Sequence, residues 1–149
     1  MIDKVRKVLA WFTSERRETL NDLGLLLLRV AIGAGMLLGH GWGKLAAFGE
    51  RADSFPDPLG VGNQLSMLLA ISAEFFCSLL LALGLATRAV AVPLIVTMLV
   101  AMLVVHGDDP WKKKEMAFLY LIPYLVIVLT GPGRFSLDAL ILKKLRPES

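Results

Sequence analysis

Four apolar stretches, separated by polar connections, dominate the hydropathy pattern of the chain. They cover about residues 23–40, 64–86, 89–105 and 115–130. A helix needs about 20 apolar residues to cross the roughly 30 Å hydrocarbon core of a bilayer. The fourth stretch is short, because sixteen residues give only about 24 Å of helix. The pattern predicts an all-α membrane protein, a four-transmembrane-helix antiparallel bundle.

Both ends of the chain are amphipathic. Near the amino terminus, apolar side chains recur every three or four positions, as in a helix with one apolar face: Ile2, Val5, Leu9 and Phe12. Near the carboxyl terminus, Ser136 can cap a helix whose leucines face lipid and whose lysines face headgroups. We therefore expect an amphipathic N-terminal surface helix in 1–22, the transmembrane domain in 23–130, and a C-terminal surface helix and tail in 131–149.

Composition and charge support a membrane location. The chain is 56% hydrophobic and only 19% charged, whereas soluble domains have about 25% charged residues. Its net charge is +3, but the basic residues lie in short clusters between apolar runs. Such clusters favour contact with anionic headgroups over contact with nucleic acid. The expected partner is the lipid bilayer, with no nucleic acid.

The distribution of basic residues predicts the orientation. Ten lysines and arginines lie in the two terminal segments and the connection between spans two and three, against five in the other two connections. Because cytoplasmic connections are enriched in Lys and Arg, both termini are expected in the cytoplasm.

Two charges lie within the apolar stretches, Arg29 in the first and Glu74 in the second. A lone charge deep in the bilayer costs at least about 2.5–3.5 kcal/mol, so both side chains are expected to face the bundle interior. Their depths differ by roughly 6 Å, and their side chains tilt in opposite directions. A direct pair and a pair bridged by water or a hydroxyl both remain open.

A second polar group is expected near the outer membrane edge. His40 and Lys44 end the first span, and Glu115 opens the fourth. Lys44 and Glu115 are predicted to form a salt bridge, and His40 can titrate near neutral pH. With the two buried charges they form the candidate ligand-binding or proton-handling set, although partly solvated helix ends would show the same residues: Arg29, His40, Lys44, Glu74 and Glu115.

Small residues recur every four positions along the first span and predict a helix-packing face: Ala31, Gly35, Gly39 and Gly43. Such spacing lets a neighbouring backbone approach closely, although glycine is also frequent by chance in membrane helices.

The sequence lacks the residues that several kinds of catalytic or metal site need. The single cysteine, Cys77, cannot form a disulfide or dithiol within the chain, and we expect it to pack as a small apolar side chain. The two histidines lack the spacing of metal ligands, so no metal is expected. No serine has the setting of a hydrolase nucleophile, and the catalytic residues stay unknown.

Seven motifs in this order and spacing resemble the DoxX family, over about residues 23–140: Arg29, Gly39-His40-Gly41, Lys44-Leu45, Ala73-Glu74, Gly84-Leu85-Ala86-Thr87-Arg88, Glu115, and Gly131 through Asp138. The resemblance implies a four-helix protein of the bacterial inner membrane, associated with membrane redox systems such as a thiosulfate:quinone oxidoreductase. Related quinone-linked thiol oxidoreductases use a cysteine pair that this chain lacks.

The expected function is an integral membrane subunit of a redox system that binds quinone or anchors a quinone-linked oxidoreductase partner. Two alternatives remain open: a non-catalytic structural or assembly membrane protein, and a small proton-coupled permease with Glu74 as the protonated site. Assembly as a homo-oligomer also remains open.

Overall fold

The computed structural model describes residues 2–6 and 15–145, and every regular element within these ranges is helical. A helical turn covers residues 2–6. The longer elements follow in chain order: α2 (Glu15–Met36), η1 (Leu37–Gly41), α3 (Trp42–Ala46), α4 (Phe48–Arg51), η2 (Ala52–Ser54), α5 (Asn63–Ile71), η3 (Ser72–Cys77), α6 (Ser78–Leu83), α7 (Thr87–Val100), η4 (Ala101–Val105), α8 (Trp111–Thr130) and α9 (Leu137–Leu145).

Three helical stretches within the described ranges are long and apolar enough to cross a membrane: Arg17–Ala46, Asn63–Leu83 and Thr87–Val105. Helix α8 has 20 residues, but four charged residues occupy its first turn and a half. Its apolar part therefore begins only at Met116 and is shorter than the other three stretches.

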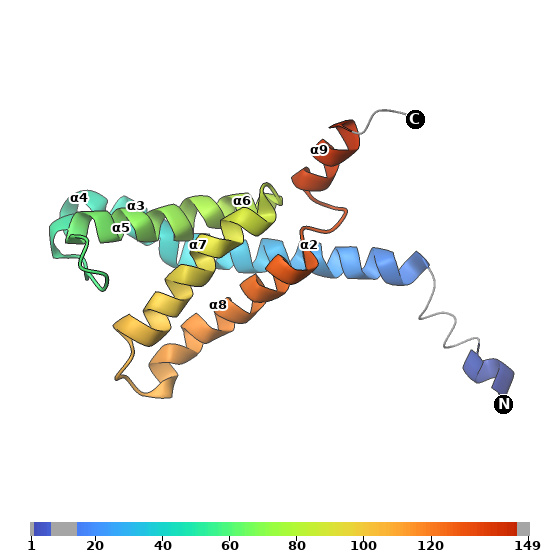
Figure 1. Cartoon of the computed structure of the whole chain (residues 1–149), viewed down its shortest axis with the longest axis horizontal. Helices are drawn as coiled ribbons and strands as arrows, with labels where there is room; N and C mark the ends of the chain where they lie inside the picture. The colour runs from blue at the N-terminus through green and yellow to red at the C-terminus, as the bar shows by residue number, and fades with distance from the viewer. Residues whose placement is uncertain (1, 7–14, 146–149) are drawn as a thin grey trace.

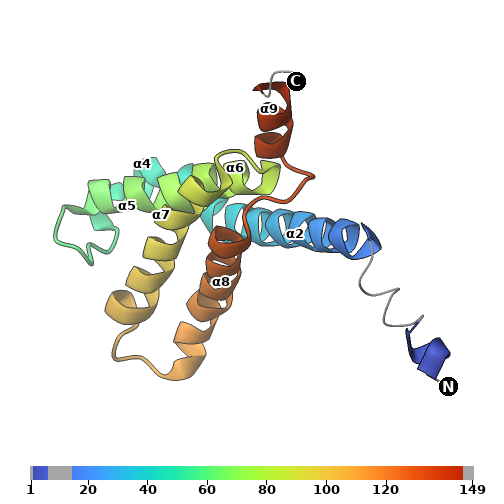
Figure 2. The same cartoon turned by 45° about the vertical axis from the view of Figure 1, so that its right-hand side comes forward.

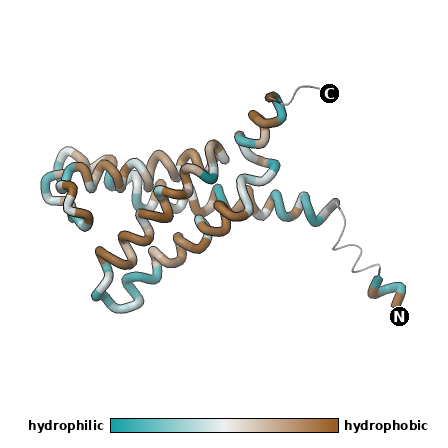
Figure 3. Tube along the Cα trace, viewed as in Figure 1, coloured by the Kyte–Doolittle hydropathy of each residue, from teal (hydrophilic) through white to brown (hydrophobic). Residues whose placement is uncertain are grey.

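The long helices form two hairpins. Helix α2 lies beside α6, and α7 lies beside α8. The α7–α8 hairpin crosses the first pair near the α6–α7 turn and diverges from α5 toward its own connecting loop, as both views show (Figures 1 and 2). Most of the apolar residues lie in the long helices, and the α7–α8 loop is polar (Figure 3). We call the end that contains Asp22, Gly84–Thr87 and Gly131–Asp138 the terminal end, and the opposite end the far end.

The outside of the bundle is apolar. Many large aliphatic side chains are exposed, among them Leu27, Leu103 and Leu129. A monomeric soluble protein rarely exposes a continuous apolar surface of this kind. The fully buried core is smaller and includes Leu81, Leu94 and Ile127. Lipid tails therefore fit this surface better than water does.

Three short π-helical turns, η1, η3 and η4, interrupt the long helices. Such turns are rare and frequently occur at functional sites. Turns η1 and η3 face each other across the contact between the first two spans. Gly41 is buried there, and a Cβ atom added to it would lie 2.5 Å from the carbonyl oxygen of Glu74. Only glycine allows this close backbone approach.

Most of the predicted packing face of small residues makes no contact within the chain, and its packing against another copy stays a prediction. Ala31, Gly39 and Gly43 are exposed, and only Gly35 has a close neighbour, the hydroxyl of Tyr120. Burial of the Arg29 charge fixes the rotation of α2 instead. The buried face of α2 is therefore the one that contains Arg29. Within η1 the next buried residue comes five positions after the last one in α2, so the buried positions are Arg29, Gly33, Met36 and Gly41.

The structure differs from the expectation at the amino-terminal boundary but shows the predicted cap near the carboxyl terminus. Helix α2 begins at Glu15 and is continuous through residue 22, so the boundary expected there falls inside a helix. Residues 7–14 and 146–149 lie outside the described residues. At the other end, the hydroxyl of Ser136 accepts a hydrogen bond of 3.1 Å from the backbone N–H of Ala139, so Ser136 caps α9 as predicted.

Candidate functional site

Arg29 is fully buried, with 0% of its surface exposed. Its guanidinium donates a hydrogen bond of 2.6 Å to the carbonyl oxygen of Phe135 and a longer one of 3.4 Å to that of Leu81. Arg29 therefore joins the first span to the end of α6 and to the α8–α9 connection.

A glycine makes room for this guanidinium. Gly84 ends α6 with φ of 73°, in the left-handed region. A Cβ atom added to Gly84 would lie 2.0 Å from the Nη1 atom of Arg29. Both the backbone conformation and the space therefore require glycine at this position.

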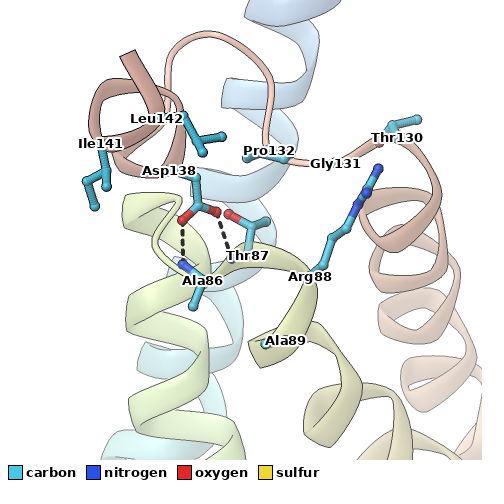
Figure 4. A pocket seen from close by; sticks show the side chains of 10 residues that line it. All are labelled: Ala86, Thr87, Arg88, Ala89, Thr130, Gly131, Pro132, Asp138, Ile141 and Leu142. Atoms are coloured by element: carbon cyan, nitrogen blue, oxygen red, sulfur yellow. Dashed lines mark hydrogen bonds between the residues drawn. The ribbon is translucent and has the colours of Figure 1, made fainter. Parts of the chain in front are cut away.

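Asp138 caps α7 from a distant part of the sequence. Its carboxylate accepts hydrogen bonds from the backbone N–H groups of Ala86 (2.7 Å) and Thr87 (2.9 Å), as Figure 4 shows. Its own backbone N–H donates to the carbonyl oxygen of Gly84 at 2.9 Å. Burial raises the pKa of Asp138, but these backbone hydrogen bonds and the charge of Arg29 outweigh it, and the pKa lies below its ordinary value.

Arg134 attaches the same connection to the start of the first span. Its side chain forms a salt bridge of 2.6 Å with Asp22 and donates to the hydroxyl of Thr19 at 2.9 Å. Three motifs that lie far apart in the sequence thus meet at the terminal end. We call this group the terminal polar cluster: Arg29, Gly84, Thr87, Arg134 and Asp138.

The proposed contact between Arg29 and Glu74 does not form. The described hydrogen bonds of Arg29 go to backbone carbonyls, one of which is Leu81, seven residues or about 10 Å along the helix from Glu74. Both charged side chains nevertheless lie inside the bundle, since Glu74 is also buried. Each has its partners at a different end of the first helix pair.

Glu74 pairs with Lys44. The Lys44 Nζ atom lies 2.5 Å from the Glu74 Oε2 atom, with 26% of the lysine side chain and 8% of the glutamate side chain exposed. The predicted Lys44–Glu115 salt bridge is therefore wrong, and Glu115 is exposed on α8. The close backbone contact at Gly41 brings the two π-helical turns together and places Lys44 against Glu74.

Aromatic residues of α8 lie beside this pair. Tyr120 contacts the ring of His40 edge to face, with 5.7 Å between ring centroids, and it stacks on Tyr124 at 6.2 Å. Tyr124 is fully buried and interacts electrostatically with Glu74. We call this group the far polar cluster: His40, Lys44, Glu74, Tyr120 and Tyr124.

The far polar cluster has unused hydrogen-bonding capacity. Among the described residues, the hydroxyls of Tyr124 and Ser78 are buried and make no hydrogen bond of normal geometry. Buried polar atoms of this kind are uncommon and need an explanation. Sequence reasoning missed both tyrosines, although their spacing of four on an apolar helix places two hydroxyls on one face.

The α7–α8 connection holds a separate polar group. His106 contacts Asp109 at 2.8 Å, and Lys113 contacts the same carboxylate at 2.9 Å. These contacts lower the pKa of Asp109 and stabilise the start of α8. Within residues 2–6 and 15–145, no group of three or more His, Cys, Asp or Glu side chains comes together as a metal site.

Comparisons with known proteins identify the family of the chain. A model of the DoxX family matches residues 24–107. The chain is 29% identical to an uncharacterised protein of Haemophilus influenzae over 111 residues, covering 71% of this chain and 73% of that protein. It is 26% identical to the inner membrane protein YqjF of Escherichia coli over 129 residues, covering 84% and 97%. No solved structure matches the chain. With more than half of its length matched by the family model, this chain belongs to the DoxX family of membrane proteins.

Proposed function

We propose that this protein is an inner-membrane subunit of a redox system and that its far polar cluster binds the headgroup of a quinone. The observation that carries the proposal is the partly buried Lys44–Glu74 ion pair, which lies between two π-helical turns and beside two tyrosines. Burying a charged pair costs free energy that an apolar pair of the same size would avoid. Binding of a polar ligand or transfer of protons at this place would explain why the protein has a charged pair here in spite of that cost.

The proposal includes a topology of four spans with both termini in the cytoplasm. Helix α8 packs along α7 over its length and would serve as the fourth span, with its charged first turn at the outer headgroups. The contacts of Arg134 and Asp138 hold the start of the first span, the α6–α7 turn and the carboxyl-terminal segment at one end. This arrangement supports placing these three segments on the cytoplasmic side.

The residues present fit a quinone headgroup. Its two carbonyl oxygens need hydrogen-bond donors, and its ring needs apolar or aromatic walls. The Lys44 ammonium has donors beyond the one that Glu74 uses, and the buried hydroxyl of Tyr124 interacts only weakly with Ser78, without a hydrogen bond of normal geometry. The rings of His40 and Tyr120 supply aromatic surface. A bound quinone would supply a two-electron, two-proton couple at this place.

The chain's own residues would handle protons and position the headgroup. Lys44 and Tyr124 would donate hydrogen bonds, and Glu74, held next to Lys44, would accept or return a proton. With one cysteine, the chain itself carries no dithiol, so we assign the electrons to an oxidoreductase partner that this protein anchors.

The proposal is tested by quinone binding to the full-length protein in a mild detergent. Ubiquinone with a short tail is titrated and bound quinone is measured by native mass spectrometry. Glu74→Gln and Lys44→Met are expected to weaken binding at least tenfold. Glu115→Gln removes an exposed carboxylate at the far end and serves as the matched control, with unchanged affinity. Equal binding by wild type and Glu74→Gln would contradict the proposal.

A structural or assembly role is the second candidate, and the terminal polar cluster favours it. Arg29, Asp138 and Arg134 all bond to backbone or to neighbouring helices within the chain, which is what a fold-locking network does. On this alternative, the double variant Lys44→Met/Glu74→Met would still complement a deletion strain. Under the quinone proposal the folded double variant fails to complement.

A further inference from the structure

We propose that the terminal end carries a binding site for an anionic phospholipid, with the headgroup phosphate at Arg88 and an acyl chain against α9. An open pocket of about 480 Å³ lies there between the α6–α7 turn, the α8–α9 connection and α9 (Figure 4). This site is separate from the far polar cluster and does not depend on the function proposed for it.

Arg88 supplies the positive charge. It is exposed at the start of α7, and the pocket view shows its side chain extending along the rim toward Thr130 (Figure 4). Its described hydrogen bond is a long one, 3.4 Å to the carbonyl oxygen of Leu129, so most of its five donors stay available for a phosphate. Gly131 leaves the space beside it, since a Cβ atom there would lie 3.2 Å from the Nη2 atom of Arg88.

The opposite wall of the pocket is apolar. Ile141 and Leu142 of α9 line it, with 44% and 61% of their surfaces exposed. Leu129, beside the Arg88 guanidinium, is 79% exposed. A cation at one side and exposed aliphatic side chains at the other match the two chemical parts of a phospholipid. A free phosphate ion would use only the arginine.

The charge balance of the site selects an anionic headgroup. Lys143 and Lys144 follow Ile141 and Leu142 in the last turn of α9 and add positive charge to this segment. Asp138 also lines the pocket, but both of its carboxylate oxygens accept backbone hydrogen bonds, and the α7 amino end that it caps carries partial positive charge. Basic residues next to a membrane attract anionic lipids by about 1 kcal/mol each, roughly a fivefold change in affinity.

The test is lipid binding to the full-length protein in a mild detergent, followed by native mass spectrometry with added phosphatidylglycerol. We expect one tightly retained lipid in the wild type and a five- to tenfold weaker affinity in Arg88→Gln. Arg88→Lys should keep most of the binding. Lys112→Gln, which removes an exposed basic residue at the far end, is the matched control and should bind as the wild type does.

Further variants and ligands separate the sources of the phosphate. The double variant Ile141→Ser/Leu142→Ser should weaken binding of long-chain phosphatidylglycerol. Its affinity for glycerol phosphate, which has no acyl chain, should stay unchanged. The proposal is overturned if Arg88→Gln binds phosphatidylglycerol as the wild type does, or if phosphatidylcholine binds equally well. Displacement of the lipid by millimolar inorganic phosphate would show an anion site instead and would also overturn it.

Discussion

The guanidinium of Arg29 lies 2.6 Å from the carbonyl oxygen of Phe135 and joins the first membrane helix to the connection after α8. We predict that Arg29→Met lowers the free energy of unfolding by about 2 kcal/mol, because a hydrogen bond from a charged donor contributes about 1.5–3 kcal/mol. Thermal unfolding in detergent measures the loss. The α8–α9 connection should also become more sensitive to limited proteolysis. Arg51→Met, at an exposed arginine of α4, should show neither effect.

Arg29 and Glu74 are predicted to act independently. Because each has its own partner, the destabilisation by Arg29→Leu and Glu74→Leu should add in the double variant to within about 0.5 kcal/mol. A double-mutant cycle in detergent provides the test. If the double variant loses markedly less stability than the sum of the two single losses, Arg29 and Glu74 interact directly, which would contradict the structure. The Lys44–Glu74 cycle should by contrast show a coupling of about 1 kcal/mol or more.

Gly41 and Gly39 should respond differently to alanine. Gly41→Ala places a methyl group 2.5 Å from the Glu74 carbonyl oxygen, so the two helices must separate, and we expect a loss of about 1–3 kcal/mol. Gly39→Ala meets nothing within 4 Å and should be neutral or stabilising, since alanine favours a helix over glycine. Thermal unfolding compares the two variants directly. Equal losses in both would show that α2 packs through another face.

The Asp138 cap should make stability depend on pH. The pKa of Asp138 is lower in the folded protein than its ordinary value of 3.8, so its charged form stabilises the fold. This contribution is complete above about pH 5 and is lost as the pH falls below 3.8 through the folded pKa. The stability difference between wild type and Asp138→Asn should therefore be about 1 kcal/mol at pH 7 and shrink progressively as the pH falls below 3.8. If this stability difference does not change with pH, the charge of Asp138 does not account for the stabilisation.

Much of the fold could be predicted from the pattern of apolar residues. The helical class, three of the spans and the burial of Arg29 and Glu74 follow from hydrophobicity and the cost of charge in lipid, and the cap at Ser136 follows from the preference for serine before a helix. These are properties of single helices or of single residues in lipid, which explains why they can be read without a structure.

Pairing between helices could not be predicted in the same way. The Lys44–Glu74 contact depends on the π-helical turns η1 and η3, which add residues to a turn and rotate everything after them. The same shift left Gly39 and Gly43 outside and put Gly41 inside. Straight-helix spacing therefore missed Gly41, the glycine of the contact between the first two spans, and pointed to the wrong partner for Lys44. The backbone carbonyls that bond Arg29 carry no side-chain signal at all.

The hydrogen bond from Arg29 to Phe135 spans 106 positions of sequence. During synthesis, the first helix enters the bilayer long before the residue that satisfies its arginine leaves the ribosome. The nascent protein must therefore carry an unfinished charge in the membrane until the last connection arrives. Chains that stop before Phe135 lack the acceptor of the shorter hydrogen bond of Arg29.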